Sequence, residues 1–195
     1  MTTPETPKII LENTLDDVQA SVVEYQLSRP RASMLDVAIN LARSAHAGQN
    51  DKLGVAYICH PLAVMRRVRT DDEKIVAALH DVVDDTAVTL DYLRTLGFDE
   101  HVVLAVDAIT KRPGETLAES MARVAASPLA LIVKRADISH NADPVRQAGL
   151  SDEARARLTE KYERSAGFLG TTLGEILGAH RVPRASGRVA EMPIF

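Results

Sequence analysis

Apolar residues recur along most of this chain at the three- and four-residue spacing that is typical of amphipathic helices. The ranges with the clearest spacing are 34–47, 73–83, 99–110, 128–141 and 152–178. Ser127 and Pro128 mark the start of the fourth range, because serine caps a helix and proline suits its first turn. The last range is expected to bend or break near Gly167 or Gly170. The pattern predicts an all-α helical bundle.

The joints between these ranges are short. Loops are expected at 47–57, 84–88 and 111–116. Residues 1–30 are expected to be an N-terminal extension with one helix, because Val18 and Val22 lie one helical turn apart. Whether that helix packs on the bundle or on a partner stays open. Residues 31–180 are expected to form the main domain, and residues 181–195 a loose C-terminal tail.

The composition fits one soluble domain. The chain has 195 residues, of which 46% are hydrophobic, which is enough for a sizeable core. It shows no apolar run of the roughly 18–20 residues that span a bilayer. The first ten residues lack a basic segment followed by an apolar one, which is the pattern of a secretory signal. Cys59 stands alone, so an internal disulfide is excluded. These features predict a cytoplasmic protein without a membrane partner.

The charge pattern argues against nucleic acid as a partner. Lysine and arginine number 23 against 27 aspartates and glutamates, for a net charge of −4. A broad nucleic-acid surface normally shows as a basic excess. Four tyrosines, three phenylalanines and no tryptophan also leave few side chains for base stacking. A small anionic ligand stays compatible, because a bound metal can supply positive charge locally. The oligomeric state stays open.

Histidine and aspartate stand at the ends of the apolar ranges. His60 comes directly before Pro61, which suits the first turn of a helix, so His60 is expected at a helix entrance. His80 and Asp81 lie near the end of an otherwise apolar helix. Two adjacent polar residues there are unfavourable when they are buried without partners. Their position therefore favours a functional role.

Further acidic residues follow at helical spacing. If the helix continues, the four-residue interval places Asp84 beside His80 and Asp85 beside Asp81. Asp137 and Asn141 share a helix face in the same way. Imidazoles and carboxylates together suit a divalent ion such as Mn²⁺, Fe²⁺ or Zn²⁺. Such an ion can polarise a phosphoryl oxygen and activate water.

Three other residues near this group have ordinary structural interpretations. Tyr57 is expected to be a packing residue with a hydrogen-bonded hydroxyl. His46 is expected to support the loop that follows it or the surroundings of the site, rather than to bind metal. His140 fits either a supporting place near the site or the surface.

The same residues belong to a longer set with a recognisable order. The set runs Ala45-His46-Ala47-Gly48-Gln49, Lys52, Gly54, Tyr57-Ile58, His60-Pro61, then 79–86 in the sequence LHDVVDDT, then Val133-Lys134, Ala136-Asp137 and His140-Asn141. The His80-Asp81 doublet is the one that names the HD-domain metal-dependent phosphohydrolases. Over residues 34–175 the whole set resembles the hydrolase domain of the RelA/SpoT alarmone enzymes, and especially the stand-alone small alarmone hydrolases.

The resemblance implies a site and a fold. The fold would be an HD-domain helical bundle, with residues 31–180 as the metal-dependent hydrolase domain. One Mn²⁺, or another divalent ion, would be held by His60, His80, Asp81 and Asp137. Asp84 and Asp85 match a Glu-Asp pair that positions and activates the attacking water. Substrate contacts would come from Lys52, Asn141 and Tyr162.

The resemblance also implies a reaction, with a small nucleotide as substrate. The family removes the 3′-pyrophosphate of guanosine tetra- or pentaphosphate. A synthetase domain is not expected within 195 residues. Two departures keep alternatives open. Asp51 stands where the family usually has arginine, which favours hydrolysis of another nucleotide. Asp84 stands where the family has glutamate, which favours a metal-bound nucleotide-binding module with little catalysis.

Overall fold

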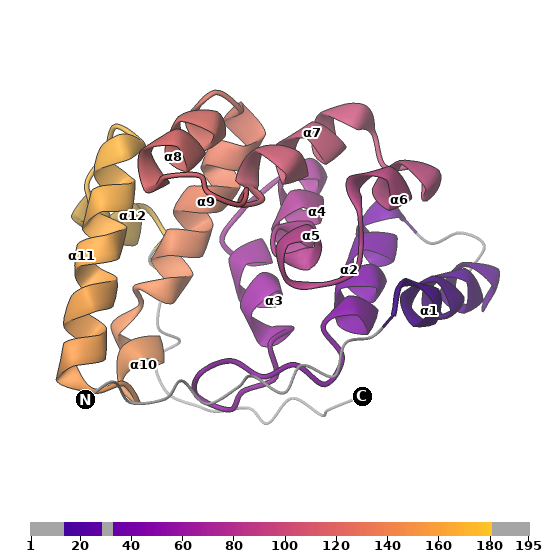
Figure 1. The fold of residues 1–195 in the computed structure, drawn as a ribbon, viewed down its shortest axis with the longest axis horizontal. Helices are drawn as coiled ribbons and strands as arrows, with labels where there is room; N and C mark the ends of the chain where they lie inside the picture. The colour runs from indigo at the N-terminus through magenta and orange to yellow at the C-terminus, as the bar shows by residue number, and fades with distance from the viewer. Residues whose placement is uncertain (1–13, 29–32, 181–195) are drawn as a thin grey trace.

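The protein, in this computed structural model, is described over residues 14–28 and 33–180. Within these ranges the regular structure is helical, apart from one isolated bridge between Asn50 and Ala56. The predicted all-α class is confirmed (Figure 1). The helices are α1 Leu15–Ser28, α2 Met34–Ala45, α3 Cys59–Met65, α4 Asp71–Leu79, α5 Val82–Asp85, α6 Leu90–Thr95, α7 Glu100–Ile109, α8 Leu117–Ala125, α9 Pro128–Asn141, α10 Pro144–Gln147, α11 Asp152–Phe168 and α12 Leu173–Ala179.

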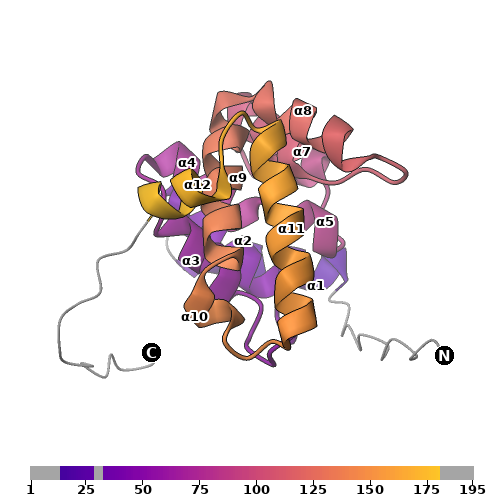
Figure 2. The ribbon, with the colours of Figure 1, turned by 90° about the vertical axis from the view of Figure 1, so that its left-hand side faces the viewer.

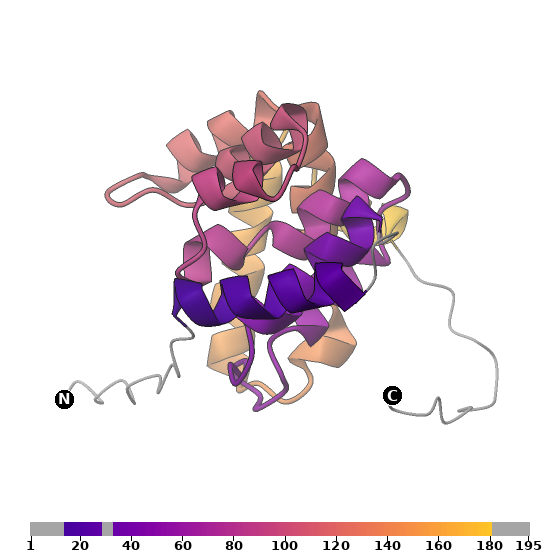
Figure 3. The same cartoon turned by 90° about the vertical axis from the view of Figure 1, so that its right-hand side faces the viewer.

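The centre of the bundle is α4. It packs against α2, α3, α7 and α9, and all five of its last residues are buried. Two of these, Ala77 and Ala78, are small enough to let neighbouring helices approach closely. Figure 3 shows α1 lying across the outside of the bundle, where it packs on α2. Val18 and Val22 of α1 belong to the hydrophobic core, so the N-terminal helix packs on the bundle itself.

The C-terminal half covers the other side of α9. Figure 2 shows α11 running along this face, and it packs against α8 and α12. The sequence predicts one bent or broken helix over residues 152–178, and the break is confirmed: α11 ends at Phe168 and α12 begins at Leu173. Gly170 lies in the connection with a φ of 68°, which favours glycine because its Cβ-free backbone tolerates positive φ. The predicted tail from residue 181 and the first 13 residues of the predicted N-terminal extension lie outside the described residues.

The helix predicted over residues 73–83 is broken into two helices in the structure. Helix α4 ends at Leu79, and α5 begins at Val82 after a turn through His80 and Asp81. Asp81 has φ −106° and ψ −5°, which departs from helical geometry. Because Asp84 and Asp85 close α5, the loop predicted at 84–88 begins later than expected.

Four described helices beyond α1 lie outside the five periodic ranges, namely α3, α6, α8 and α10, and of these only α3 is expected, from Pro61. The start signals of the other three are nevertheless in the sequence. Thr116 and Glu119 form a capping box at α8, with each side chain accepting a hydrogen bond from the other residue's backbone N–H. Asp143 caps α10 in front of Pro144. None of the described helices combines the length and hydropathy needed to cross a membrane.

Replacing Leu41 by alanine is expected to lower the free energy of unfolding by about 2–5 kcal/mol, because it removes a fully buried side chain. Chemical denaturation followed by circular dichroism measures this change. Leu104→Ala is the matched control, since Leu104 is 53% exposed and its loss is expected to change stability by no more than about 0.5 kcal/mol. Equal effects of the two substitutions would contradict the assignment of Leu41 to the core.

Candidate metal centre

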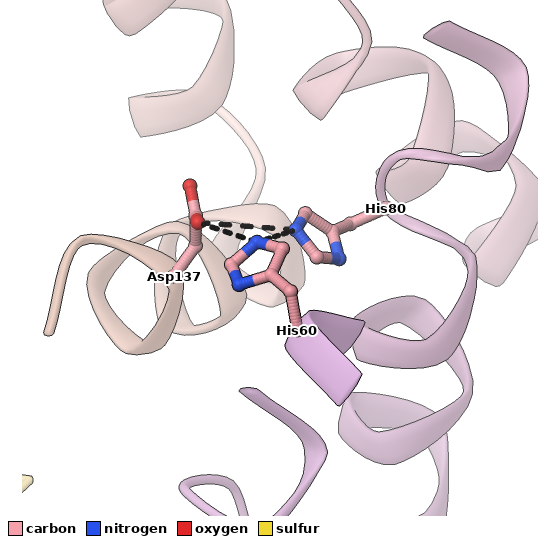
Figure 4. A group of neighbouring side chains, drawn as sticks. All are labelled: His60, His80 and Asp137. Atoms are coloured by element: carbon pink, nitrogen blue, oxygen red, sulfur yellow. Dashed lines mark hydrogen bonds and ion pairs between the residues drawn. The ribbon is translucent and has the colours of Figure 1, made fainter. Parts of the chain in front are cut away.

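Side chains from two helices and one turn converge in the interior. His60 lies in the first turn of α3, His80 and Asp81 form the turn between α4 and α5, and Asp137 lies on α9. Figure 4 shows three of these side chains, His60, His80 and Asp137, pointing toward one another. All three are at least 95% buried. Their donor atoms lie within 4.8 Å of one another.

The fourth residue, Asp81, lies next to the same group. Its Oδ2 is 3.1 Å from His80 Nε2 and 3.5 Å from His60 Nε2. Asp137 Oδ1 is 3.2 Å from His60 Nε2 and 3.9 Å from His80 Nε2. Donors about 2.1 Å from one ion and at right angles to each other are separated by about 3 Å. The spacing of these atoms therefore suits a single divalent ion.

The turn after α4 explains how the adjacent residues His80 and Asp81 can both face the proposed metal site. Successive side chains of a continuous α-helix point about 100° apart. His80 Nδ1 lies 2.8 Å from the carbonyl oxygen of Ala77. A ring nitrogen that donates to a carbonyl leaves the other nitrogen, Nε2, with a free lone pair for a metal. The helix break thus places His80 and Asp81 side by side and orients the His80 ring.

Other residues hold the remaining donors. His140 Nδ1 is 2.7 Å from His60 Nδ1, so one ring donates to the other and His60 Nε2 faces the centre. The Tyr57 hydroxyl donates to Asp81 Oδ2 at 2.8 Å, as its interpretation as a hydrogen-bonded packing residue predicts. Burial, followed by the neighbouring Asp81 carboxylate, raises the pKa of Tyr57, so the phenol stays protonated.

Asp137 has two hydrogen-bond partners besides the histidines of the site. Lys134 Nζ donates to Oδ2 at 2.8 Å, and Asn141 Nδ2 donates to Oδ1 at 2.5 Å. Burial disfavours the charge of Asp137, but Lys134 and the two histidines hold its pKa well below the usual value. Burial also opposes protonation of His80, yet Asp81 and Asp137 raise the pKa of His80 to about 9. Carboxylates and imidazoles are thus tightly coupled, and a divalent cation can replace the shared protons.

A cavity of about 1140 Å³ opens above the convergent side chains. Its lining includes Lys52, Asp85, Asn141 and Tyr162, so the structure places these four sequence-predicted residues around one space. Asp84 is not among the lining residues; it was expected beside His80, and its Oδ2 instead contacts Lys111 Nζ at 2.5 Å. The expected placement of Asp84 beside His80 depended on an unbroken helix, and the structure breaks that helix between Leu79 and Val82.

The sequence prediction missed several cations of this cavity. Lys111, Lys134 and Lys161 all line it. Burial, followed by repulsion from Lys134 and Lys111, lowers the pKa of Lys161. Lys111 and Lys134 are paired with Asp84 and Asp137, whereas Lys161 forms no ion pair with a described residue, so the unbalanced positive charge of this wall is that of Lys161. This cluster is hard to predict from sequence, because its three lysines come from a loop, α9 and α11.

The loop that follows α2 reaches the same site through His46. Its Nδ1 lies 2.8 Å from Gln49 Oε1, and Gln49 Nε2 donates to the backbone oxygen of Asp85 at 3.1 Å. His46 is buried, and Gln49 links its ring to the backbone at the end of α5. The expectation that His46 supports the loop and the surroundings of the site agrees with these contacts.

Known proteins resemble this chain in sequence and in fold. A probable GTP pyrophosphokinase of Mycobacterium leprae is 35% identical over 136 residues, or 63% of this chain. The bifunctional (p)ppGpp synthase/hydrolase SpoT of Escherichia coli K12 is 31% identical over 139 residues, or 64% of the chain. A guanosine-3′,5′-bis(diphosphate) 3′-pyrophosphohydrolase of Vibrio cholerae is 38% identical over 101 residues, or 50% of the chain. The chain is an HD-type, RelA/SpoT hydrolase-like protein.

The match covers only a small part of each of these three relatives. The chain spans 17%, 19% and 14% of the lengths of those three proteins, respectively. A solved structure of a metazoan SpoT ortholog that hydrolyzes ppGpp matches with a TM-score of 0.63 and 22% identity, over 75% of this chain and 93% of that one. That match is a likeness of fold. No protein-family model matches the RelA/SpoT hydrolase-like chain.

Proposed function

We propose that this RelA/SpoT hydrolase-like protein is a metal-dependent enzyme that removes the 3′-pyrophosphate of guanosine tetra- or pentaphosphate. The observation that carries the proposal is the convergence of two imidazoles and two carboxylates beneath a cavity with a cationic wall. The printed names of the Vibrio and Escherichia relatives agree with this reaction. Other relatives are named pyrophosphokinases. We propose hydrolysis alone, as in the small alarmone hydrolases, because the donor set suits water activation.

We assign the metal to His60, His80, Asp81 and Asp137, with Mn²⁺ as the ion. The mixed nitrogen and oxygen donors suit a borderline divalent cation. When bound, the ion would supply Lewis-acid activation of water and of the phosphoryl group. The domain is proposed to span residues 31–180, with residues 1–30 as an extension and 181–195 as a tail, although α1 also contributes to the core.

Residues of the chain would position the attacking water and bind the nucleotide. Asp85 lines the cavity and has a carboxylate that can orient the attacking water and accept its proton. Lys111, Lys134 and Lys161 would balance the charge of the pyrophosphate. Lys52 and Tyr162 are proposed to contact the nucleotide. Asn141 shares this role, and its hydrogen bond to Asp137 also holds a proposed metal ligand in place.

The direct test is pyrophosphate release from guanosine tetraphosphate with Mn²⁺. We expect turnover by the natural chain and none by Asp81→Ala, which removes a charged ligand. Mn²⁺ is also expected to raise the melting temperature of the natural chain and not of Asp81→Ala. Asp91→Ala is the matched control, because the Asp91 side chain on α6 is exposed. Turnover by Asp81→Ala equal to that of the control would sink the assignment.

A second candidate, hydrolysis of another nucleotide, is favoured by Asp51 on the cavity wall. A panel of nucleotides tests this alternative, together with Asp51→Arg. If Asp51 sets the specificity, the arginine should improve turnover of guanosine tetraphosphate relative to the panel. The third candidate, a binding module, rests on Asp84. Nucleotide binding without turnover in metal-saturated protein would favour the binding module over both proposed hydrolase activities.

Replacing His140 by alanine is expected to weaken Mn²⁺ binding by about 10- to 100-fold, because the His60 ring loses the partner that orients it. Isothermal titration calorimetry measures the change. His101→Ala is the control, since His101 lies on the surface and pairs with Asp72. Unchanged Mn²⁺ affinity in a folded His140→Ala protein would argue against His60 as a ligand.

A further inference from the structure

An ion pair forms part of the wall at one end of the cavity. Asp51 Oδ2 lies 3.2 Å from a terminal guanidinium nitrogen of Arg146, which belongs to α10. The Asp51 side chain is 9% exposed and that of Arg146 is 23% exposed. The other carboxylate oxygen, Oδ1, accepts hydrogen bonds from the backbone nitrogens of Leu53 and Val55. Asp51 therefore holds its own loop with one oxygen and Arg146 with the other.

Arg146 stands at the boundary between two spaces. It lines the large cavity and also a smaller one of about 400 Å³. Leu53 lines both cavities as well, and Gly149 packs so closely on it that a Cβ there would lie 3.1 Å from Leu53 Cδ2. The loop after α2 and the segment after α10 are thus in direct contact. This contact joins the loop that carries Asp51 to the segment that follows Arg146.

The two ends of the large cavity differ in charge. Near Lys111, Lys134 and Lys161 the unbalanced charge is that of Lys161, because Lys111 pairs with Asp84 and Lys134 pairs with Asp137, whereas Lys161 forms no ion pair with a described residue. At the other end Asp51 balances the charge of Arg146. A neutralised guanidinium attracts phosphate weakly, but it keeps a flat, poorly hydrated face that stacks on aromatic rings.

We propose that Arg146 binds the nucleobase of the substrate by stacking, and that Asp51 is the residue that positions it. The proposal rests on the proposed function for the identity of the nucleotide. It assigns the base to the Asp51–Arg146 end and the pyrophosphate to the lysine end. A purine suits this place because its two fused rings offer the larger stacking face.

The test compares a ligand that has a base with one that has none. Binding of guanosine diphosphate and of inorganic pyrophosphate to the Mn²⁺-loaded protein is measured by calorimetry. Arg146→Ala is expected to weaken the binding of guanosine diphosphate by about tenfold and to change that of pyrophosphate by less than about twofold. Arg146→Lys keeps the charge but lacks the flat face, so it should not rescue. Arg157→Ala is the control, because Arg157 is an exposed residue of α11.

The role of Asp51 is tested through Asp51→Asn. Asparagine keeps the oxygen that binds the loop and loses the charge that holds Arg146. The KM for guanosine tetraphosphate should rise several-fold with little change in kcat. The double variant with Arg146→Ala should be no weaker than Arg146→Ala alone, because both act through one contact. Additive losses would mean that Asp51 acts only on the loop, and would overturn its positioning role.

Two results would overturn the role of Arg146. Equal weakening of guanosine diphosphate and pyrophosphate binding would make Arg146 a phosphate contact. Unchanged binding of both would exclude it from the site. A natural chain that binds guanosine diphosphate but does not release pyrophosphate from guanosine tetraphosphate would contradict the proposed function. The stacking role would still be decided by the binding of the variants.

Discussion

Replacing Asp137 by asparagine is expected to lower Mn²⁺-dependent pyrophosphate release by at least about 10³-fold. Losing a partner outside the ligand set already weakens metal sites by about 10- to 100-fold, and Asp137 is proposed as a ligand itself. Its Oδ1 lies 3.2 Å from His60 Nε2 and 3.9 Å from His80 Nε2. An amide oxygen carries no charge and binds a divalent cation much more weakly. Steady-state kinetics and Mn²⁺ calorimetry measure the two losses.

The same substitution is expected to weaken the fold. Asp137 is the ion-pair partner of Lys134, whose side chain is 19% exposed. Breaking a buried ion pair on one side costs about 3–5 kcal/mol. The double variant Lys134→Met with Asp137→Asn removes both charges and should recover much of that stability without recovering turnover. Mn²⁺-dependent turnover by either variant within tenfold of the natural chain would contradict the assignment of Asp137 to the metal.

The helices of the bundle are predictable from sequence because they depend on local patterns of apolar residues. The grouping of His60, His80 and Asp137 is implied by the family resemblance, since no local pattern links residues so far apart in the chain. Periodic apolar residues define α2, α7 and α9, and the charged positions stand out at the ends of such runs. The break after Leu79 was not accessible in this way. The apolar positions continue through Val82 and Val83, so the pattern extends across a turn that depends on how His80 packs against Ala77.

The cationic wall and the Asp51–Arg146 pair depend on tertiary structure. Lys111 contacts Asp84 from 27 positions away, and Arg146 reaches Asp51 across 95 positions, from 51 to 146. Nothing in the local pattern links such residues. Position 51 shows the consequence. From sequence, Asp51 is a negative charge that repels phosphate, whereas in the structure its charge is balanced by Arg146.

Asp84 and Asp85 are adjacent, and the family resemblance assigns both to the attacking water. The structure separates them. Asp85 lines the cavity, and its backbone oxygen accepts a hydrogen bond from Gln49. Asp84 contacts Lys111 through Oδ2 at 2.5 Å. We therefore expect Asp85 to act on water directly and Asp84 to act through the position of Lys111.

Replacing Asp85 by asparagine is expected to lower kcat by about 10²- to 10⁴-fold, the range that general base catalysis contributes. Mn²⁺ affinity should change little, because Asp85 is not among the proposed ligands. Asparagine keeps the size of the side chain and removes the charge that accepts a proton. Steady-state kinetics at saturating Mn²⁺ measure the loss.

Asp84→Asn is the matched control within the same turn of α5. It is expected to raise KM more than it lowers kcat, because it releases Lys111 from its ion pair and leaves the carboxylate of Asp85 in place. Lys111→Ala should have a similar effect on KM, since it removes the other half of that pair. A larger loss of kcat in Asp84→Asn than in Asp85→Asn would reverse the two roles. It would require Asp84 to leave Lys111 and turn into the cavity when the nucleotide binds.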